Sequence, residues 1–292
     1  MNTEKIGVIG VGELGKALGH VLEKAGTQVL YYDRDDDRTT TRSIEDMVKA
    51  CNILLVCVPS WVNRNVAKEI AKHADPQNLP LVISFSKGVE KGFVTMDEVL
   101  KDALPEGTPY GLVYGPMLAN ELVAHMMGSG VLALSEVGYD STIRDIFAKA
   151  RVFLEPSTDV RGTAISGVLK NVYAMAFGMC DGLKLGANAR GRLSVMVLRE
   201  MKRILTDLGA NAATAEGLAG LGDLLAAGTG ESSFNYRVGR SIAERIADQN
   251  LKSEGLSTLL ELPHVIKLEQ YPLVNLMDKL IYHYGDPHEF QQ

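Results

Sequence analysis

The first half of the chain alternates short apolar runs with amphipathic segments. Runs with the length and composition of buried strands cover Ile6–Gly10, Val29–Tyr32, Ile53–Val58, Leu81–Ser84, Leu112–Tyr114, Val131–Leu134 and Val152–Leu154. Between the first two runs, apolar residues recur at helical spacing, which predicts a helix over Glu13–Ala25 with one face on a sheet. A succession of strand, helix and strand favours parallel pairing, so we expect a doubly wound, mostly parallel α/β sheet.

The pattern changes after Glu155-Pro156-Ser157. Long helical periodicities dominate from Thr163 onward, and no further strand-like alternation is convincing. We therefore expect two domains, an α/β domain over residues 1–157 and an all-helical domain over residues 158–292. A chain of 292 residues is long enough for two domains of ordinary size.

A glycine motif stands where the first strand meets the first helix. Gly10-Val11-Gly12-Glu13-Leu14-Gly15 has the spacing GxGxxG in the strand-turn-helix context that dinucleotide binding requires. Gly10 permits the tight turn, Gly12 removes a Cβ that would block a pyrophosphate, and Gly15 lets the helix approach the sheet. The motif predicts a Rossmann domain that binds a dinucleotide. A glycine-rich turn without a ligand is the alternative.

The second strand ends at Asp33. A carboxylate at this position accepts hydrogen bonds from the adenosine ribose hydroxyls and repels a 2′-phosphate, so we expect NAD in preference to NADP. Two alternatives stay open. Asp33 simply opens the acidic loop 35–37, or Arg34 and Arg38 meet a phosphate.

Two lysines stand in otherwise apolar segments. The helix predicted over residues 163–180 is apolar nearly all round, as buried helices are, yet contains Lys170 and Asn171. Burial of an ammonium lowers its pKa, which a general base requires, so Lys170 is the leading catalytic candidate. The alternative is a side chain that reaches solvent from the helix edge. Lys87 follows the Leu81–Ser84 strand at the carboxyl edge, where ligands bind in such sheets, unless it is an ordinary surface lysine.

Asp223 is a carboxylate among leucine, glycine and alanine. A buried acid needs a cation, and Lys170 is a natural partner, although a helix N-cap role for Asp223 fits the local sequence equally well. The histidines show no spacing typical of metal ligands, and we expect no metal.

Composition and charge limit the binding partners and the cellular compartment that we expect for this protein. The formal net charge is -6 and no long basic stripe is present, which disfavours nucleic acid. Cys51, Cys57 and Cys180 lie in apolar surroundings without CxxC spacing, as in a reducing compartment. We find no secretory signal and no apolar run long enough to span a membrane, so we expect a soluble, cytoplasmic protein that binds no membrane.

Several motifs in order give the chain a resemblance to the NAD(P)-dependent glycerol-3-phosphate dehydrogenase family over nearly its whole length. The motifs are the glycine fingerprint 10–15, Ser86-Lys87-Gly88-Val89, Gly115-Pro116 with Ala119, Leu169-Lys170-Asn171, Gly182 to Asn188, Gly217 to Asp223, and Glu254-Gly255. The ordered set is far more specific than any single motif.

The resemblance implies roles for these residues. Lys170 is the general base, Lys87 polarises the developing carbonyl, and Asp223 positions Lys170. The residues implied to contact the cofactor also include Glu13, Leu14, Pro59, Ala119 and Glu254, and those implied to contact substrate include Gly115, Asn171, Ser233, Phe234 and Asn235. The resemblance further implies a small-molecule substrate and a homodimer formed through the helical domain.

The chain departs from the family pattern on the substrate side. Phe234-Asn235 replaces an arginine and asparagine that bind the substrate phosphate, Ala227 replaces a threonine, and Met117 replaces a small hydroxyl residue. Arg237, Arg240, Arg190 or Arg192 are the candidates to supply the phosphate contact instead.

The sequence is therefore compatible with three functions. The first is glycerol-3-phosphate dehydrogenase activity. The second is an NAD-dependent relative that acts on a different, unphosphorylated or bulkier hydroxy compound, because Phe234 exchanges charge for apolar area. The third is a catalytically idle NAD-binding or sensing protein, against which the retained Lys170, Lys87 and Asp223 speak.

Overall fold

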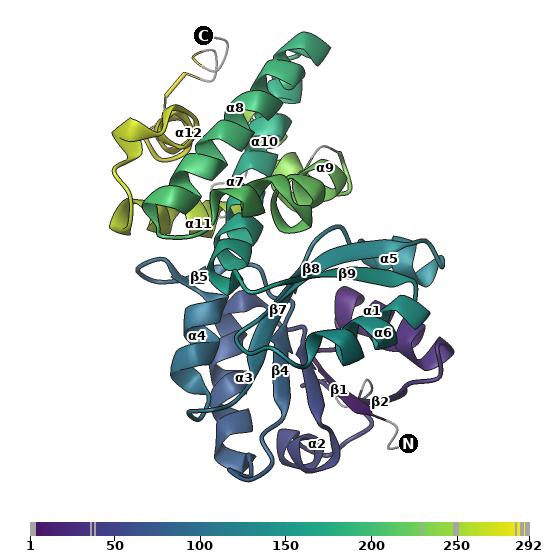
Figure 1. Cartoon of the computed structure of the whole chain (residues 1–292). Coiled ribbons are helices and arrows are strands. Elements are labelled where there is room, and N and C mark those ends of the chain that lie inside the picture. Colours follow the sequence, from purple (N-terminus) through teal and green to yellow (C-terminus); the bar gives the residue numbers. More distant parts are fainter. Residues whose placement is uncertain are drawn as a thin grey trace. The chain divides into compact units, whose positions relative to one another are not determined.

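The computed structural model describes residues 4–35, 37, 39–228, 230–247, 251–283, 285–286 and 289, with Ala227 described by its backbone only. The chain forms two compact units (Figure 1). The first comprises Met1–Lys87 and Thr95–Val160, and the second comprises Gly88–Val94 and Arg161–Gln292.

The first unit is built on a twisted sheet. Among the described residues its seven strands are β1 (Lys5–Ile9), β2 (Gln28–Tyr32), β3 (Ile53–Val56), β4 (Leu81–Ser84), β7 (Tyr110–Tyr114), β8 (Gly128–Leu134) and β9 (Val152–Ser157). Their order is β2-β1-β3-β4-β7-β8-β9, and every neighbouring pair is parallel except β7 with β8. The expectation of a mostly parallel Rossmann-type sheet followed by a helical region is confirmed.

Helices cover both faces of this sheet (Figure 1). They are α1 (Glu13–Lys24), α2 (Ile44–Ala50), α3 (Ser60–His73), α4 (Met96–Ala103), α5 (Ala119–Val123) and α6 (Asp140–Lys149). The predicted apolar face of α1 packs on β1 through Ala17, Leu18 and Val21, within the core that Phe147 of α6 completes. The amphipathic spacing of α1 therefore orients the helix whose N-terminus follows the glycine motif.

Three features of the strands differ from the expectation. Pairing of β7 with β8 is antiparallel, because the connection through the short α5 returns the chain without a full helical crossover. β9 continues past Leu154 through Pro156, which an edge strand tolerates because its outer N–H groups need no partner. The hairpin of β5 (Val89–Glu90) and β6 (Val94–Thr95) was not expected.

The second unit is helical. It contains α7 (Val160–Gly182), α8 (Gly186–Asp207), α9 (Asp223–Ala227), α10 (Phe234–Ala243), α11 (Glu254–Glu261) and α12 (Pro272–Tyr282), with short helical turns at Ala212–Glu216, Leu218–Gly222, Leu262–His264 and Leu268–Gln270. In the part of the chain that the structure describes, no helix is both long and apolar enough to cross a membrane.

Helix α7 is the centre of the second unit, as its apolar pattern predicts: every residue from Gly162 to Cys180 is buried. It packs backbone to backbone on α10. A Cβ on Gly178 would lie 1.9 Å from the Tyr236 carbonyl oxygen, and a Cβ on Gly239 would lie 1.9 Å from that of Met175. These glycines let the two helices approach closely, and the approach sets the positions of the polar residues at one end of the pair.

Glu200 joins three helices of this unit. Its buried carboxylate accepts hydrogen bonds from the Tyr173 hydroxyl of α7 at 3.0 Å and from the backbone N–H groups of Leu273 and Val274 at 2.9 Å each. The two N–H groups belong to the first turn of α12, which has no intrahelical acceptor for them. Burial raises the pKa of Glu200, and these hydrogen bonds oppose that rise.

Candidate functional site

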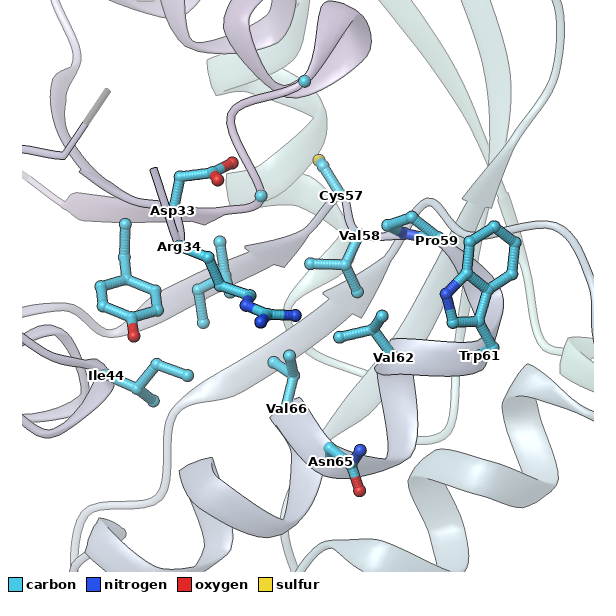
Figure 2. Close-up of a pocket in the computed structure, with 14 residues that line it drawn as sticks. Asp33, Arg34, Ile44, Cys57, Val58, Pro59, Trp61, Val62, Asn65 and Val66 are labelled. Atoms are coloured by element: carbon cyan, nitrogen blue, oxygen red, sulfur yellow. The ribbon is translucent and has the colours of Figure 1, made fainter. Parts of the chain in front are cut away.

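The first unit contains a cavity of about 620 Å³ at the carboxyl ends of β1, β2 and β3 (Figure 2). Its lining residues come from the glycine turn, the end of β2, α2 and the start of α3. They are Ile9, Gly10, Gly12, Tyr32, Asp33, Arg34, Ile44, Cys57, Val58, Pro59, Trp61, Val62, Asn65 and Val66. This is the edge at which parallel α/β sheets bind ligands.

The glycine motif has the geometry that its spacing predicts. Gly10 has a φ of 93°, which favours glycine, and a Cβ there would lie 2.8 Å from a methyl of Val58. A Cβ on Gly15 would lie 2.0 Å from the Gly10 carbonyl oxygen. At Gly12, by contrast, a Cβ would meet none of the described atoms within 4 Å, because this residue faces the cavity. The open cradle beside the N-terminus of α1 fits a pyrophosphate.

Asp33 is fixed at the wall of this cavity. The Val11 N–H donates a hydrogen bond to its Oδ2 at 2.5 Å, and the Asp35 N–H donates to its Oδ1 at 3.1 Å. The Asp33 N–H in turn donates to Thr39 Oγ1 at 2.9 Å. Asp33 therefore contacts the glycine turn as well as its own loop. Arg34 lines the same cavity, whereas Asp36 and Arg38 lie outside the described residues.

The start of α3 contributes residues that sequence reasoning mostly missed. Pro59, expected on the cofactor side, is the N-cap of α3 and lines the cavity with Trp61 and Val62. The order of the strands could have predicted this placement, because residues that follow β3 must lie at the same carboxyl edge as the glycine turn. Cys57 also lies here, and burial raises the pKa of its thiol to about 12, so it stays protonated at neutral pH.

Lys87 lies at the carboxyl ends of β4 and β7. Its Nζ donates a hydrogen bond to the Gly115 carbonyl oxygen at 3.3 Å and lies 5.5 Å from the centre of the Tyr114 ring. The Tyr114 hydroxyl donates to the Ser86 carbonyl oxygen. These contacts make Lys87 a half-buried, oriented side chain rather than a mobile surface lysine.

The remaining cofactor-side candidates of the first unit begin helices. Glu13 and Leu14 form the first turn of α1 directly after Gly12, with Glu13 exposed and Leu14 half-buried. Ala119 is the first residue of α5 and packs on the apolar core. Met117, expected on the substrate side, is buried in that same core.

The second unit holds a buried ion pair. Lys170 Nζ on α7 lies 3.5 Å from Oδ1 of Asp223, with side-chain exposures of 11% and 3%. The alternative of a lysine that reaches solvent is therefore wrong. Asp223 is the first residue of α9, whose N-cap is Gly222, so the carboxylate pairs with an ammonium instead of capping the helix. Pairing of this kind offsets part of the cost of burying a charged side chain.

Three further residues form a polar network in this unit. Asn235 Nδ2 donates to Asn171 Oδ1 at 3.1 Å, and Asn235 Oδ1 accepts from the Gly255 N–H at 3.0 Å. A Cβ on Gly255 would lie 2.7 Å from the Asn171 carbonyl oxygen, so only glycine allows this approach. Glu254 is the first residue of α11, immediately before Gly255, and the Ser253 hydroxyl caps that helix. The structure thus brings Asn171, Asn235 and the start of α11 together.

The start of α10 carries Phe234, at the position where an arginine was expected to bind a substrate phosphate. Ser233 caps the helix by accepting from the Tyr236 N–H, and Phe234 is 48% exposed. The Arg237 guanidinium carbon lies 5.6 Å from the centre of the Phe234 ring. Arg237 also donates a hydrogen bond to the Glu231 carbonyl oxygen. Two other candidate arginines are engaged by carboxylates, Arg240 by Glu231 and Glu244, and Arg190 by Asp181, whereas Arg192 is an exposed residue of α8. The side chain of Ala227 lies outside the described residues.

Family models match most of the chain. The model for the C-terminus of NAD-dependent glycerol-3-phosphate dehydrogenase matches residues 159–292, and the model for its N-terminus matches residues 38–138. A third model, for the NAD-binding domain of D-isomer specific 2-hydroxyacid dehydrogenase, matches residues 1–71.

Individual relatives extend over the whole chain. A glycerol-3-phosphate dehydrogenase (NAD(P)+) of Nitratidesulfovibrio vulgaris is 32% identical over 99% of this chain and 97% of its own. One of Acinetobacter baylyi is 29% identical over 97% of this chain and 87% of its own. The crystal structure of a glycerol-3-phosphate dehydrogenase from Coxiella burnetii matches with a TM-score of 0.87 and 25% identity, covering 99% of this chain and 97% of the other.

Proposed function

Because the chain belongs to the NAD(P)-dependent glycerol-3-phosphate dehydrogenase family, we propose that it interconverts sn-glycerol 3-phosphate and dihydroxyacetone phosphate with NAD as its cofactor. The observation that carries this proposal is the buried Lys170–Asp223 pair. A lysine withdrawn from solvent beside a carboxylate is a suitable general base for a hydroxyl group.

The chemistry divides between cofactor and protein. A nicotinamide cofactor held in the cavity of the first unit would supply the hydride acceptor for oxidation of the carbinol carbon and the hydride donor for reduction of the carbonyl. Lys170 Nζ takes the hydroxyl proton in the oxidising direction and gives it back in the reducing one. Asp223 orients the amine and balances the charge of the ammonium that forms. By similarity to the family, Asn171 and Asn235 hydrogen-bond the substrate, and Lys87 stabilises the developing negative charge on oxygen.

Asp33 supports NAD over NADP. Its carboxylate is held at the cavity wall by the Val11 N–H, where an additional phosphate on the ribose would meet a negative charge. Gly12 leaves room for the pyrophosphate beside the α1 N-terminus, and Pro59 lines the same cavity.

A second candidate rests on Phe234. This exposed ring at the start of α10 makes the neighbourhood of Asn235 more apolar than an arginine would. The substrate is then an unphosphorylated or bulkier hydroxy compound. If the substrate is phosphorylated, Arg237 beside the ring is the cation to hold it, because Arg237 donates to a backbone carbonyl, that of Glu231, whereas Arg240 is engaged by the carboxylates of Glu231 and Glu244.

The deciding experiment is NADH oxidation by the purified protein with dihydroxyacetone phosphate, beside NADPH and a panel of unphosphorylated ketones. Saturable turnover with the phosphate ester supports the first candidate, and turnover with an unphosphorylated ketone alone supports the second. Lys170→Ala is expected to lower kcat by a factor of about 10² to 10⁴ while calorimetry still detects NAD binding. NAD binding without turnover of any substrate would instead indicate an idle binding protein.

A matched pair of arginine variants locates the phosphate contact. Arg237→Ala is expected to raise KM for dihydroxyacetone phosphate by about tenfold or more, as loss of a charge-assisted hydrogen bond does. Arg240→Ala, three residues further along the same helix and paired with two carboxylates, is expected to leave KM nearly unchanged. Equal effects of the two substitutions would contradict the assignment to Arg237.

A further inference from the structure

Trp61 is exposed to a degree that is unusual for its residue type. The side chain is 71% exposed, whereas tryptophan is on average one of the more buried residues. The core does not need it: α3 packs inward through Ser60, Asn63, Val66, Ala67 and Ile70. A single exposed apolar side chain is common on protein surfaces, so exposure alone assigns nothing to Trp61.

The position of Trp61 supplies the second observation. The residue lines the 620 Å³ cavity together with Gly12 and Asp33. In Figure 2, Asp33 and Trp61 lie on opposite sides of the cavity residues Val58 and Pro59. The indole is therefore exposed at the rim of a cavity that already fits a dinucleotide, at the end away from the residue expected to hold the adenosine ribose.

We propose that Trp61 is a cofactor-binding residue, whose indole packs against the part of the dinucleotide that lies beyond the pyrophosphate from adenosine. The inference rests on the proposed binding of NAD in this cavity. Indole offers a large, rigid apolar face, and its contact with a sugar or an aromatic ring excludes water from both surfaces. Binding would thereby remove from solvent the apolar area that the free protein exposes.

The chain contains one tryptophan, so tryptophan fluorescence reports on Trp61 alone. Titration with NAD+, which does not itself fluoresce, is expected to quench or shift the emission to saturation at the concentration where calorimetry shows binding. AMP, which carries only the adenosine end, is expected to leave the emission nearly unchanged. A response to AMP as large as that to NAD+ would overturn the proposed placement.

Substitutions test the contact without any catalytic readout. Trp61→Ala is expected to weaken NAD+ binding by about threefold to tenfold in calorimetry, and Trp61→Phe, which retains an aromatic face, by less. Phe153→Ala is the matched control, since Phe153 is a 49% exposed aromatic residue on β9 of the same unit and does not line the cavity. It should bind NAD+ like the unsubstituted protein.

The failures of the two proposals are distinguishable. Saturable NAD+ binding with unchanged emission and an unchanged Kd for Trp61→Ala would overturn the role of Trp61 alone. A complete lack of NAD+ and NADP+ binding to the unsubstituted protein would overturn the assignment of the cavity and the role of Trp61 together.

Discussion

The carbonyl oxygen of Gly10 occupies the space that a β-carbon on Gly15 would need, 2.0 Å away, whereas a β-carbon on Gly12 would meet open space. Two alanine substitutions in one motif should therefore fail in different ways. Gly15→Ala is expected to cost about 2 kcal/mol or more of unfolding free energy, because the helix must move from the turn. Gly12→Ala, at an ordinary φ of -71°, is expected to change stability by less than about 0.5 kcal/mol.

The second half of this prediction concerns the ligand. The methyl group of Gly12→Ala would stand in the space that fits the pyrophosphate, so calorimetry should show NAD+ binding weakened by at least about tenfold. Urea denaturation of both variants gives the stabilities. Normal NAD+ affinity in a well-folded Gly12→Ala protein would contradict the assignment of this turn.

The Lys170–Asp223 pair predicts a coupled effect on stability. Asp223→Leu leaves a buried ammonium without its carboxylate, which is expected to cost about 3 to 5 kcal/mol. Lys170→Met in the same chain removes the stranded charge, so the double variant should recover most of that loss, although it should be inactive. Urea denaturation of the single and double variants measures the coupling. Simple addition of the two single costs would show that the pair does not act as a unit.

The carboxylate of Asp33 predicts a preference for NADH over NADPH. Asp33→Asn keeps an oxygen that can accept the Val11 hydrogen bond but removes the negative charge. The ratio of kcat/KM with NADPH to that with NADH should rise by about tenfold, because the repulsion of a 2′-phosphate is lost. Asp35→Asn is the control, since that carboxylate lies in the same loop but does not line the cavity. The assignment fails if both substitutions shift the ratio equally.

Glu200 predicts a pH dependence of stability. Its pKa is raised in the folded protein, so between the unfolded and folded pKa values the folded state binds more protons. Its contribution to the unfolding free energy must therefore grow as pH falls from neutral toward the ordinary glutamate pKa. The wild-type protein should gain stability relative to Glu200→Gln between about pH 7 and about pH 5 in urea denaturation. A difference that stays constant across this range would contradict the raised pKa.

Much of the fold follows from the pattern of apolar residues. Each run expected to form a strand does so, because parallel strands buried on both faces need continuous apolar sequence. The antiparallel turn from β7 to β8 could not be foreseen, since strand direction depends on how the intervening chain packs and not on the composition of either strand. The β5–β6 hairpin escaped notice because its strands span two residues each, too few for any periodicity.

The sequence predicted which residue types form the candidate site, but it could not predict which residues surround them. An isolated Lys170 in an apolar helix indicated either a buried side chain or one that extends to solvent from the helix edge. Only the packing of α7 against its neighbours decides between these alternatives. The cavity residue Trp61 was overlooked because a lone tryptophan gives no spacing signal. Its proximity to Gly12 and Asp33 depends on the register of β1, β2 and β3, which brings three distant segments to one edge.

The small β5–β6 hairpin has a consequence for the order of events during synthesis. Val89 and Phe93 belong to the apolar core of the helical unit, and the Gly92 N–H donates to Glu261 Oε2 at 2.6 Å. These partners are separated by 169 positions along the chain. During synthesis on the ribosome, the hairpin's apolar side chains therefore stay exposed to water until the C-terminal helices have emerged. A protease cut near residue 160 would release a helical fragment that lacks part of its own core.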